Sequence, residues 1–172
     1  TAPILAHIHE AKGRVCLPTT DVESKESAER ELFRIEKVIH LDWSPDGRSI
    51  AFGGVRAGQS DVYVFNTLAG SQVPLWEDPW DDLMPDWLPD GSGLVFSSNR
   101  PDGWDTLPPW PVPATRDLWV YRLDEKRFER LTDTPTQDEV DPKALGGGRF
   151  ACRENQDLNT VSLAILDSAS LR

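Results

Sequence analysis

The stretch Leu41-Asp42-Trp43-Ser44-Pro45-Asp46-Gly47-Arg48-Ser49-Ile50-Ala51-Phe52 decides the fold of this 172-residue chain, because its central part occurs twice. The segment Trp43-Ser44-Pro45-Asp46-Gly47 recurs 44 positions later as Trp87-Leu88-Pro89-Asp90-Gly91. In both copies the motif is followed by a β-rich run, Ser49–Phe52 and then Gly93–Phe96. Repetition at a fixed period is the sequence signature of a repeat architecture. We therefore predict repeated units with tryptophan, turn and strand in the same order.

The Pro-Asp-Gly motif of each copy predicts a tight hairpin turn. Proline fixes φ for the turn, aspartate accepts hydrogen bonds from nearby backbone N–H groups, and glycine tolerates positive φ. We therefore assign a structural role in turns to Pro45, Asp46, Gly47, Pro89, Asp90 and Gly91.

Each repeat has room for four short strands, which in the first complete copy are about Val38–Trp43, Arg48–Gly53, Asp61–Asn66 and Gln72–Trp76. The next copy contains 12 additional residues, since Asp46 to Asp61 spans 15 positions and Asp90 to Asp117 spans 27. A third, weaker copy aligns Asp82-Leu83-Met84 with Asp138-Glu139-Val140, a shift of 56 that is again 44 once the insertion is subtracted. Its turn is Leu145-Gly146-Gly147-Gly148.

The first 37 residues do not follow this pattern closely. Ile4–His9 and Arg14–Leu17 look like strands, and Glu31–Glu36 resembles an outer strand. Between them, Asp21–Arg34 is rich in Glu, Lys, Ala and Arg, which favours either a short helix or a disordered charged loop. We interpret this region as part of an earlier repeat with an insertion.

A period of about 44 residues with four strands is that of a propeller blade. Leu41–Phe52, Pro85–Gly91, Phe96–Arg100 and Asp117–Val120 resemble the WD40-like PD40 repeat of TolB-like β-propellers. The expected fold is all-β, a β-propeller of four-stranded antiparallel blades with about three to four blades in this chain, as a partial ring or fragment. The expected segments are a partial blade with a charged insertion (1–37), a PD40 blade (38–81), a PD40 blade with a Pro/Trp insertion at 102–116 (82–137) and a degenerate or incomplete blade (138–172).

So few blades predict exposed apolar surface. Each blade buries its faces only against its neighbours, so an open arc leaves two apolar blade faces uncovered. We therefore expect a fragment of a longer protein, a ring closed by a second copy, or a chain packed on another subunit.

Composition limits the classes of partner. With 18 basic and 29 acidic residues the net charge is −11, which disfavours nucleic acids and anionic membrane surfaces. The longest mainly apolar stretch, Val161–Leu166, is far shorter than the ~20 residues that span a bilayer, so no direct membrane insertion is expected. Cys16 and Cys152 alone do not make a four-cysteine zinc site or a disulfide framework.

Catalytic and cofactor motifs are missing from the sequence. No G-x-S-x-G nucleophile elbow occurs, and Gly146-Gly147-Gly148 lacks the Lys-Ser/Thr of a phosphate-binding loop. His7 and His9 share a face of a strand and would bind a metal only if a further ligand came from elsewhere; the preferred interpretation is a pair of surface or core histidines. We therefore predict no enzyme activity, no cofactor and no metal.

Two features indicate a protein or peptide partner. Trp43, Trp87 and Trp119 occupy repeat positions and are expected in the core. Loop aromatic and apolar side chains are favoured at interfaces, and we assign partner binding to Trp76, Trp80, Trp104, Leu107 and Trp110. The insertion that carries the last three is interpreted as a docking loop; the alternative is a loop that folds back over the blade edge. Acidic residues recur before the inner strands, namely Glu77, Asp78, Asp81, Asp82 and Asp86 and then Asp133, Asp138, Glu139 and Asp141. The resemblance places Asp82 and Asp138 at a channel mouth, where they would attract a cation or a basic peptide; solvated loop carboxylates are the alternative.

The expected function is a non-catalytic protein- or peptide-binding propeller scaffold, part of a larger envelope-type assembly. One alternative is a gating or specificity propeller of a prolyl-oligopeptidase-like hydrolase whose catalytic domain lies outside this chain. Another is a purely structural accessory subunit of a larger complex. The resemblance also implies an extracytoplasmic location, in the periplasm or cell envelope.

Overall fold

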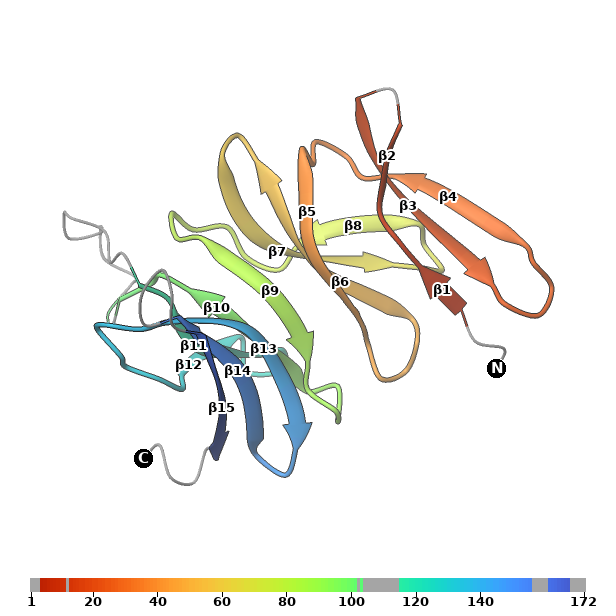
Figure 1. Ribbon diagram of the computed structural model, residues 1–172. Helices are drawn as coiled ribbons and strands as arrows, with labels where there is room; N and C mark the ends of the chain where they lie inside the picture. Colours follow the sequence, from red (N-terminus) through yellow and green to blue (C-terminus); the bar gives the residue numbers. More distant parts are fainter. Residues whose placement is uncertain (1–3, 12, 102, 104–114, 156–160, 168–172) are drawn as a thin grey trace.

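The protein consists of four antiparallel β-sheets that follow one another along the chain (Figure 1). A computed structural model describes residues 4–11, 13–101, 103, 115–155 and 161–167. Every regular element in these ranges is a strand. Because the strands of each sheet are consecutive in sequence, the chain completes one sheet before it begins the next, as repeated blades require.

The first sheet contains β1 (Ile4–Ala6), β2 (His9–Ala11), β3 (Arg14–Asp21) and β4 (Ser27–Glu31). β1 and β2 pair with opposite halves of β3, so together they form one interrupted strand. β4 pairs with the other edge of β3. The three remaining sheets contain β5 (Lys37–Trp43), β6 (Ser49–Arg56), β7 (Gln59–Asn66) and β8 (Ser71–Pro74); β9 (Asp82–Trp87), β10 (Gly93–Ser98), β11 (Asp117–Arg122) and β12 (Arg127–Arg130); and β13 (Asp138–Gly146), β14 (Arg149–Asn155) and β15 (Val161–Asp167).

The prediction of a helix or a disordered loop over Asp21–Arg34 is wrong. Asp21 Oδ1 accepts hydrogen bonds from the backbone N–H groups of Glu23 and Ser24, at 2.9 and 2.8 Å, which closes a tight turn. The chain then returns as β4, so the outer strand of this sheet is Ser27–Glu31 and not the predicted Glu31–Glu36. Local side-chain bonding and pairing with β3 outweigh the helical propensity of the Glu, Lys and Ala residues.

The two Pro-Asp-Gly motifs form the hairpin turns that their composition predicts. Gly47 and Gly91 have φ of 68° and 73°, in the left-handed region that glycine tolerates. Asp46 Oδ1 accepts a hydrogen bond from the Arg48 N–H at 3.0 Å, and Asp90 Oδ1 accepts one from the Ser92 N–H at 2.9 Å. Hydrogen bonds from the hydroxyls of Ser44 and Ser92, together with these backbone bonds, lower the pKa of both carboxyls.

The weak third copy is displaced by one residue from the predicted alignment. The inner strands β9 and β13 each contain one non-glycine residue with positive φ, Met84 at 54° and Asp141 at 52°, and these lie 57 positions apart rather than 56. Glu139, not Asp138, is therefore the counterpart of Asp82. The hairpin that follows closes on Gly147-Gly148 with φ of 63° and 75°, so two residues separate β13 from β14, whereas five residues separate β9 from β10.

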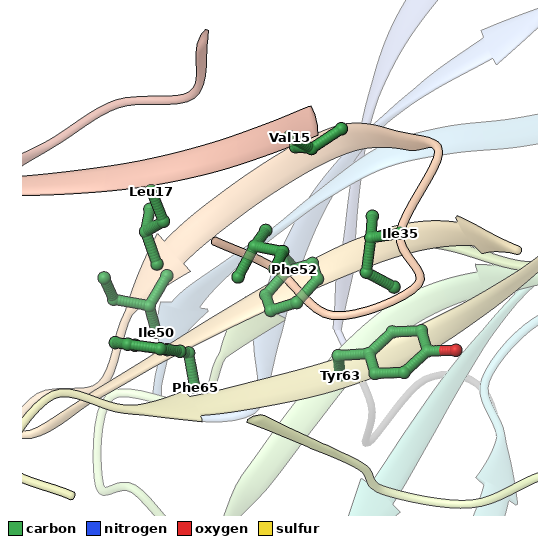
Figure 2. Packing of buried hydrophobic residues seen from close by; sticks show 8 residues of the cluster. Val15, Leu17, Ile35, Ile50, Phe52, Tyr63 and Phe65 are labelled. Carbon is green, nitrogen blue, oxygen red and sulfur yellow. The ribbon is translucent and has the colours of Figure 1, made fainter. Parts of the chain in front are cut away.

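One apolar cluster fills each space between consecutive sheets. Between the first and second sheets, Val15 and Leu17 of β3 meet Ile50, Phe52, Tyr63 and Phe65 of β6 and β7 (Figure 2). The second and third sheets share the cluster of Val62, Phe96, Trp119 and Tyr121, and the third and fourth share Leu88, Val95, Val120 and Phe150. Of the three tryptophans expected in the core, Trp119 is buried, whereas Trp43 and Trp87 are only partly buried.

Aspartate carboxylates also connect consecutive sheets. Asp42 Oδ2 accepts a hydrogen bond from the Trp87 N–H at 2.9 Å, and Asp86 Oδ2 accepts one from the Ala144 N–H at 2.8 Å. Each aspartate directly precedes the last residue of the inner strand of its repeat, and each donor lies on the inner strand of the next. The same type of hydrogen bond therefore joins the second sheet to the third and the third sheet to the fourth. At the interface between the third and fourth sheets, Lys143 also forms an ion pair with Asp86.

Candidate protein-binding surface

Two of the predicted partner-binding tryptophans pack against the core. Trp80 is fully buried, and its carbonyl and that of Asp78 accept hydrogen bonds from the Gln59 side-chain amide. The Trp76 ring packs against Tyr121 and Phe128 at centroid distances of 4.6 and 5.0 Å. The segment from Trp76 to Asp81 therefore folds back onto the core between the second and third sheets, where Trp80 is fully buried and Trp76 partly buried, and partner binding by these two side chains stays a prediction.

The other three residues predicted to bind a partner belong to the Pro/Trp insertion. Trp104, Leu107 and Trp110 lie outside the residues that the structure describes. The insertion that contains them connects β10 to β11, so the docking loop stays a prediction.

Arg100 is the central polar residue of this interface and is not among the predicted site residues. Its side chain is fully buried, and its Nη2 lies 2.5 Å from Asp82 Oδ2 and 3.1 Å from Asp78 Oδ2. The guanidinium also lies over the Phe128 ring, 4.1 Å from the centroid. A buried cation held by carboxylates and aromatic rings is an arrangement that arginine suits particularly well.

Asp82 does not contribute to a negatively charged channel mouth. Its side chain is completely buried, and Trp76 Nε1 donates a hydrogen bond of 2.5 Å to the same oxygen that contacts Arg100. Burial raises the pKa of Asp82 to about 6 although Arg100 opposes the shift. In β7 of the second sheet, burial and the charges of Asp82 and Asp78 raise the pKa of Asp61 to about 7. These carboxyls form an internal network rather than a surface that attracts cations.

The other carboxylates of the predicted funnel are largely neutralised by neighbouring cations. Asp138 lies 3.5 Å from Arg116 and accepts a hydrogen bond from the backbone N–H of the same residue. Further ion pairs join Glu77 to Arg56, Asp133 to Arg130, Asp141 to Arg153 and Asp86 to Lys143. Glu139 is buried and accepts hydrogen bonds from Thr132 and Thr134. The repetition of acidic residues therefore reflects their structural pairing.

A cleft of about 740 Å³ lies between the third and fourth sheets and is lined by Arg122, Arg127, Arg130 and Arg149 among others. Three of these arginines are already paired. Arg122 and Arg127 contact Glu129 at 3.2 and 2.7 Å, and Arg130 contacts Asp117 at 2.6 Å. The pairing leaves little concentrated positive charge for an anionic ligand.

The most distinctive surface is the apolar face of β15, the last described strand. Val161, Leu163 and Ile165 alternate along β15 and are 60, 77 and 67% exposed. Their equivalents in the preceding sheet are buried: by strand register, Leu163 corresponds to Leu118 and Ile165 to Val120, and both of these are 0% exposed. The fourth sheet covers Val120, but no described residue covers Ile165 in the same way.

The comparisons with known proteins agree with this architecture. No model of a known protein family matches the sequence. The chain is 29% identical over 96 residues to the uncharacterized protein Atu1656 of Agrobacterium fabrum, an alignment that covers 56% of this chain and 29% of that protein. It is 34% identical over 62 residues to the uncharacterized peptidase YuxL of Bacillus subtilis, covering 36% of this chain and 9% of that protein. The chain thus spans less than a third of the length of either relative.

Solved structures give a broader match. The putative TolB from Agrobacterium tumefaciens superposes with a TM-score of 0.75 at 21% identity, covering 95% of this chain and 57% of that one. TolB from Acinetobacter baumannii gives 0.72 at 16% identity, with 98% and 42% covered. A prolyl endopeptidase gives 0.64 at 17% identity, with 96% and 25% covered.

These sheets define a segment of a β-propeller. More narrowly, the fold is that of the TolB-like β-propellers, in agreement with the resemblance of the PD40 repeats.

Proposed function

We propose that this chain is a non-catalytic, protein-binding propeller scaffold that forms part of a larger envelope-type assembly outside the cytoplasm. The exposed apolar face of β15 is the observation that carries the proposal. The similarity of fold to the two TolB structures supports a protein partner.

Covering this face would contribute part of the energy of a specific contact. Burying one large aliphatic side chain completely contributes roughly 1.5–3 kcal/mol. Val161, Leu163 and Ile165 are each more than half exposed, so covering all three would contribute about 3–5 kcal/mol before the entropic cost of association is subtracted. The alternating pattern suits an occupant that presents an apolar sheet face, as the next blade of a ring does.

The Pro/Trp insertion is proposed as a second contact region. Its prolines favour extended backbone without ladder hydrogen bonds, which would present Trp104, Leu107 and Trp110 semi-rigidly. Replacing Trp104 and Trp110 by Ala is expected to weaken partner binding without unfolding the sheets. Unchanged binding by the double variant would remove the loop from the proposal.

Site-specific photocrosslinking tests the β15 face directly. A photoreactive phenylalanine analogue placed at Leu163 in cells is expected to form adducts with one discrete protein, because this side chain is 77% exposed on the proposed surface. The control position is Val73 in β8, which is also an exposed aliphatic residue of a strand, at 55%. Adducts at both positions alike, or at neither, would contradict the proposal.

A gating propeller of a hydrolase is the second candidate. The similarity to the YuxL peptidase and the superposition on a prolyl endopeptidase favour it. Under this hypothesis the crosslinked partner, or the continuation of the reading frame, contains a G-x-S-x-G nucleophile elbow. A partner without hydrolase motifs favours the scaffold.

A further inference from the structure

The outward face of the first sheet brings together side chains with metal-binding chemistry. Val15 and Leu17 of β3 point into the core shared with the second sheet (Figure 2), so the alternation of a strand places Cys16 on the opposite face. His9 of β2 is the cross-strand partner of Cys16. On the other side of β3, Glu29 of β4 is the cross-strand partner of Pro18, and its carboxylate reaches Cys16 diagonally. Three adjacent strands thus contribute one imidazole, one thiol and one carboxylate to the same point.

The distances suit a single ion. His9 Nε2 lies 3.0 Å from Glu29 Oε2, and one ligand atom from each of His9, Cys16 and Glu29 lies within 4.8 Å of the others. In a tetrahedral site with bonds of about 2.0–2.3 Å, ligand atoms are separated by roughly 3.3–3.8 Å. Small side-chain rotations therefore bring these atoms into coordinating positions without moving the strands.

Charge complementarity points to a divalent cation. The cluster places the Cys16 thiol beside the carboxylate of Glu29, and Glu31 is the cross-strand partner of Cys16. A thiolate, a carboxylate and a neutral imidazole carry two negative charges, which one divalent ion balances. The soft sulfur ligand favours zinc over magnesium or calcium, which prefer oxygen ligands.

We propose that His9, Cys16 and Glu29 form a zinc-binding site that joins β2, β3 and β4. Three protein ligands leave a fourth position for water. The His7 ring, 5.9 Å from the His9 ring between centroids, is a neighbour of this site rather than one of its three ligands. The site would anchor β4, all five residues of which are exposed, to the better buried β3. The proposal is independent of partner binding at β15, which lies in the fourth sheet.

Calorimetric titration of the tag-free, reduced and chelator-treated protein with zinc chloride tests the site. One zinc ion per chain is expected to bind. His9→Gln and Glu29→Gln alter side chains that are 41 and 54% exposed, so both variants should fold, and each should weaken binding about tenfold or more. His40→Gln and Cys152→Ser are matched controls, because they change the same residue types elsewhere in the chain and should leave the affinity unchanged.

Cobalt supplies a second readout that identifies the thiolate ligand. Wild type and both controls are expected to show a near-ultraviolet sulfur-to-cobalt charge-transfer band, which Cys16→Ser removes. If Cys16→Ser fails to fold, loss of the same band in His9→Gln decides the question. The absence of stoichiometric zinc binding, or an affinity that is unchanged in His9→Gln and Glu29→Gln, would overturn the proposal.

Discussion

Removing the buried cation at Arg100 is the sharpest perturbation of the interface between the second and third sheets. Arg100→Met keeps an unbranched side chain of similar length but leaves Asp82 and Asp78 without their shared cation. Breaking a buried ion pair by deleting one partner typically costs about 3–5 kcal/mol. The lost contact with the Phe128 ring adds to this cost, so we expect the free energy of unfolding at pH 8 to fall by at least about 3 kcal/mol.

The cost of this substitution should depend on pH. The pKa of Asp82 is already raised to about 6 by burial, and loss of Arg100 raises it further, since the arginine stabilises the ionised form. At pH 5 the carboxyl is therefore largely protonated in both proteins, and no buried charge is left unpaired at Asp82. We expect the destabilisation by Arg100→Met to be clearly smaller at pH 5 than at pH 8.

Urea unfolding followed by tryptophan fluorescence measures both quantities. Arg56→Met is the matched control, because Arg56 pairs with Glu77 at the surface, with side chains 42 and 61% exposed, and exposed pairs contribute roughly 0–1 kcal/mol. Combining Arg100→Met with Asp82→Asn should cost less than the sum of the single variants, since the two residues interact directly. A loss at pH 8 below about 1 kcal/mol, or one equal to that of the control, would refute the reasoning.

Three further predictions concern single sites. Burial raises the folded-state pKa of Asp61 from 3.8 to about 7. Proton binding by this carboxyl therefore stabilises the folded state fully below pH 3.8, and this contribution is lost as the pH rises through 7. Asp61→Asn should flatten the pH dependence of the free energy of unfolding and raise it at pH 8 by about 1–2 kcal/mol, as urea titrations at pH 5 and 8 would show. Gly93→Ala should cost more than about 2 kcal/mol and lower the melting temperature in calorimetry, because the new Cβ would lie 2.2 Å from the Tyr121 carbonyl oxygen. Asp90→Ala removes the acceptor of two Ser92 hydrogen bonds at an exposed turn, and a loss of about 1 kcal/mol in urea unfolding is expected; a loss above 3 kcal/mol would contradict a purely local role.

The turns and the propeller fold could be predicted from sequence because they depend on local chemistry that repeats. Pro-Asp-Gly forms the same hairpin turn at Gly47 and at Gly91, and the spacing of the two motifs reveals the period of the repeat. The third copy was misaligned by one residue because its Gly147-Gly148 turn has a different length, and only strand pairing identifies Glu139 as the counterpart of Asp82.

The candidate site was harder to predict because burial is a property of packing. Trp76 and Trp80 lie in a connection between strands, which is normally exposed, yet this connection folds back onto the buried Arg100. The acidic residues near them form a visible pattern, but their arginine and lysine partners are distant in sequence, as in the pair of Asp86 and Lys143. Pairing across sheets therefore decides whether such a charge attracts a ligand.

The composition of β15 shows a related limit. The alternation of Val161, Leu163 and Ile165 with other apolar or small residues is visible in sequence, and exposed blade faces were expected for a partial ring. Which strand carries the exposed face follows only from the register, which equates Leu163 with the buried Leu118.

Light scattering on a size-exclusion column, at several protein concentrations, tests the central claim that β15 is a protein-binding face. Without its partner, the wild-type chain is expected to associate through this apolar surface, so that its mass exceeds that of one chain and rises with concentration. Leu163→Asp with Ile165→Asp should restore the monomer, whereas the control Val73→Asp should not. A wild-type chain that is monomeric at every concentration, and behaves identically to the β15 variant, would contradict the account.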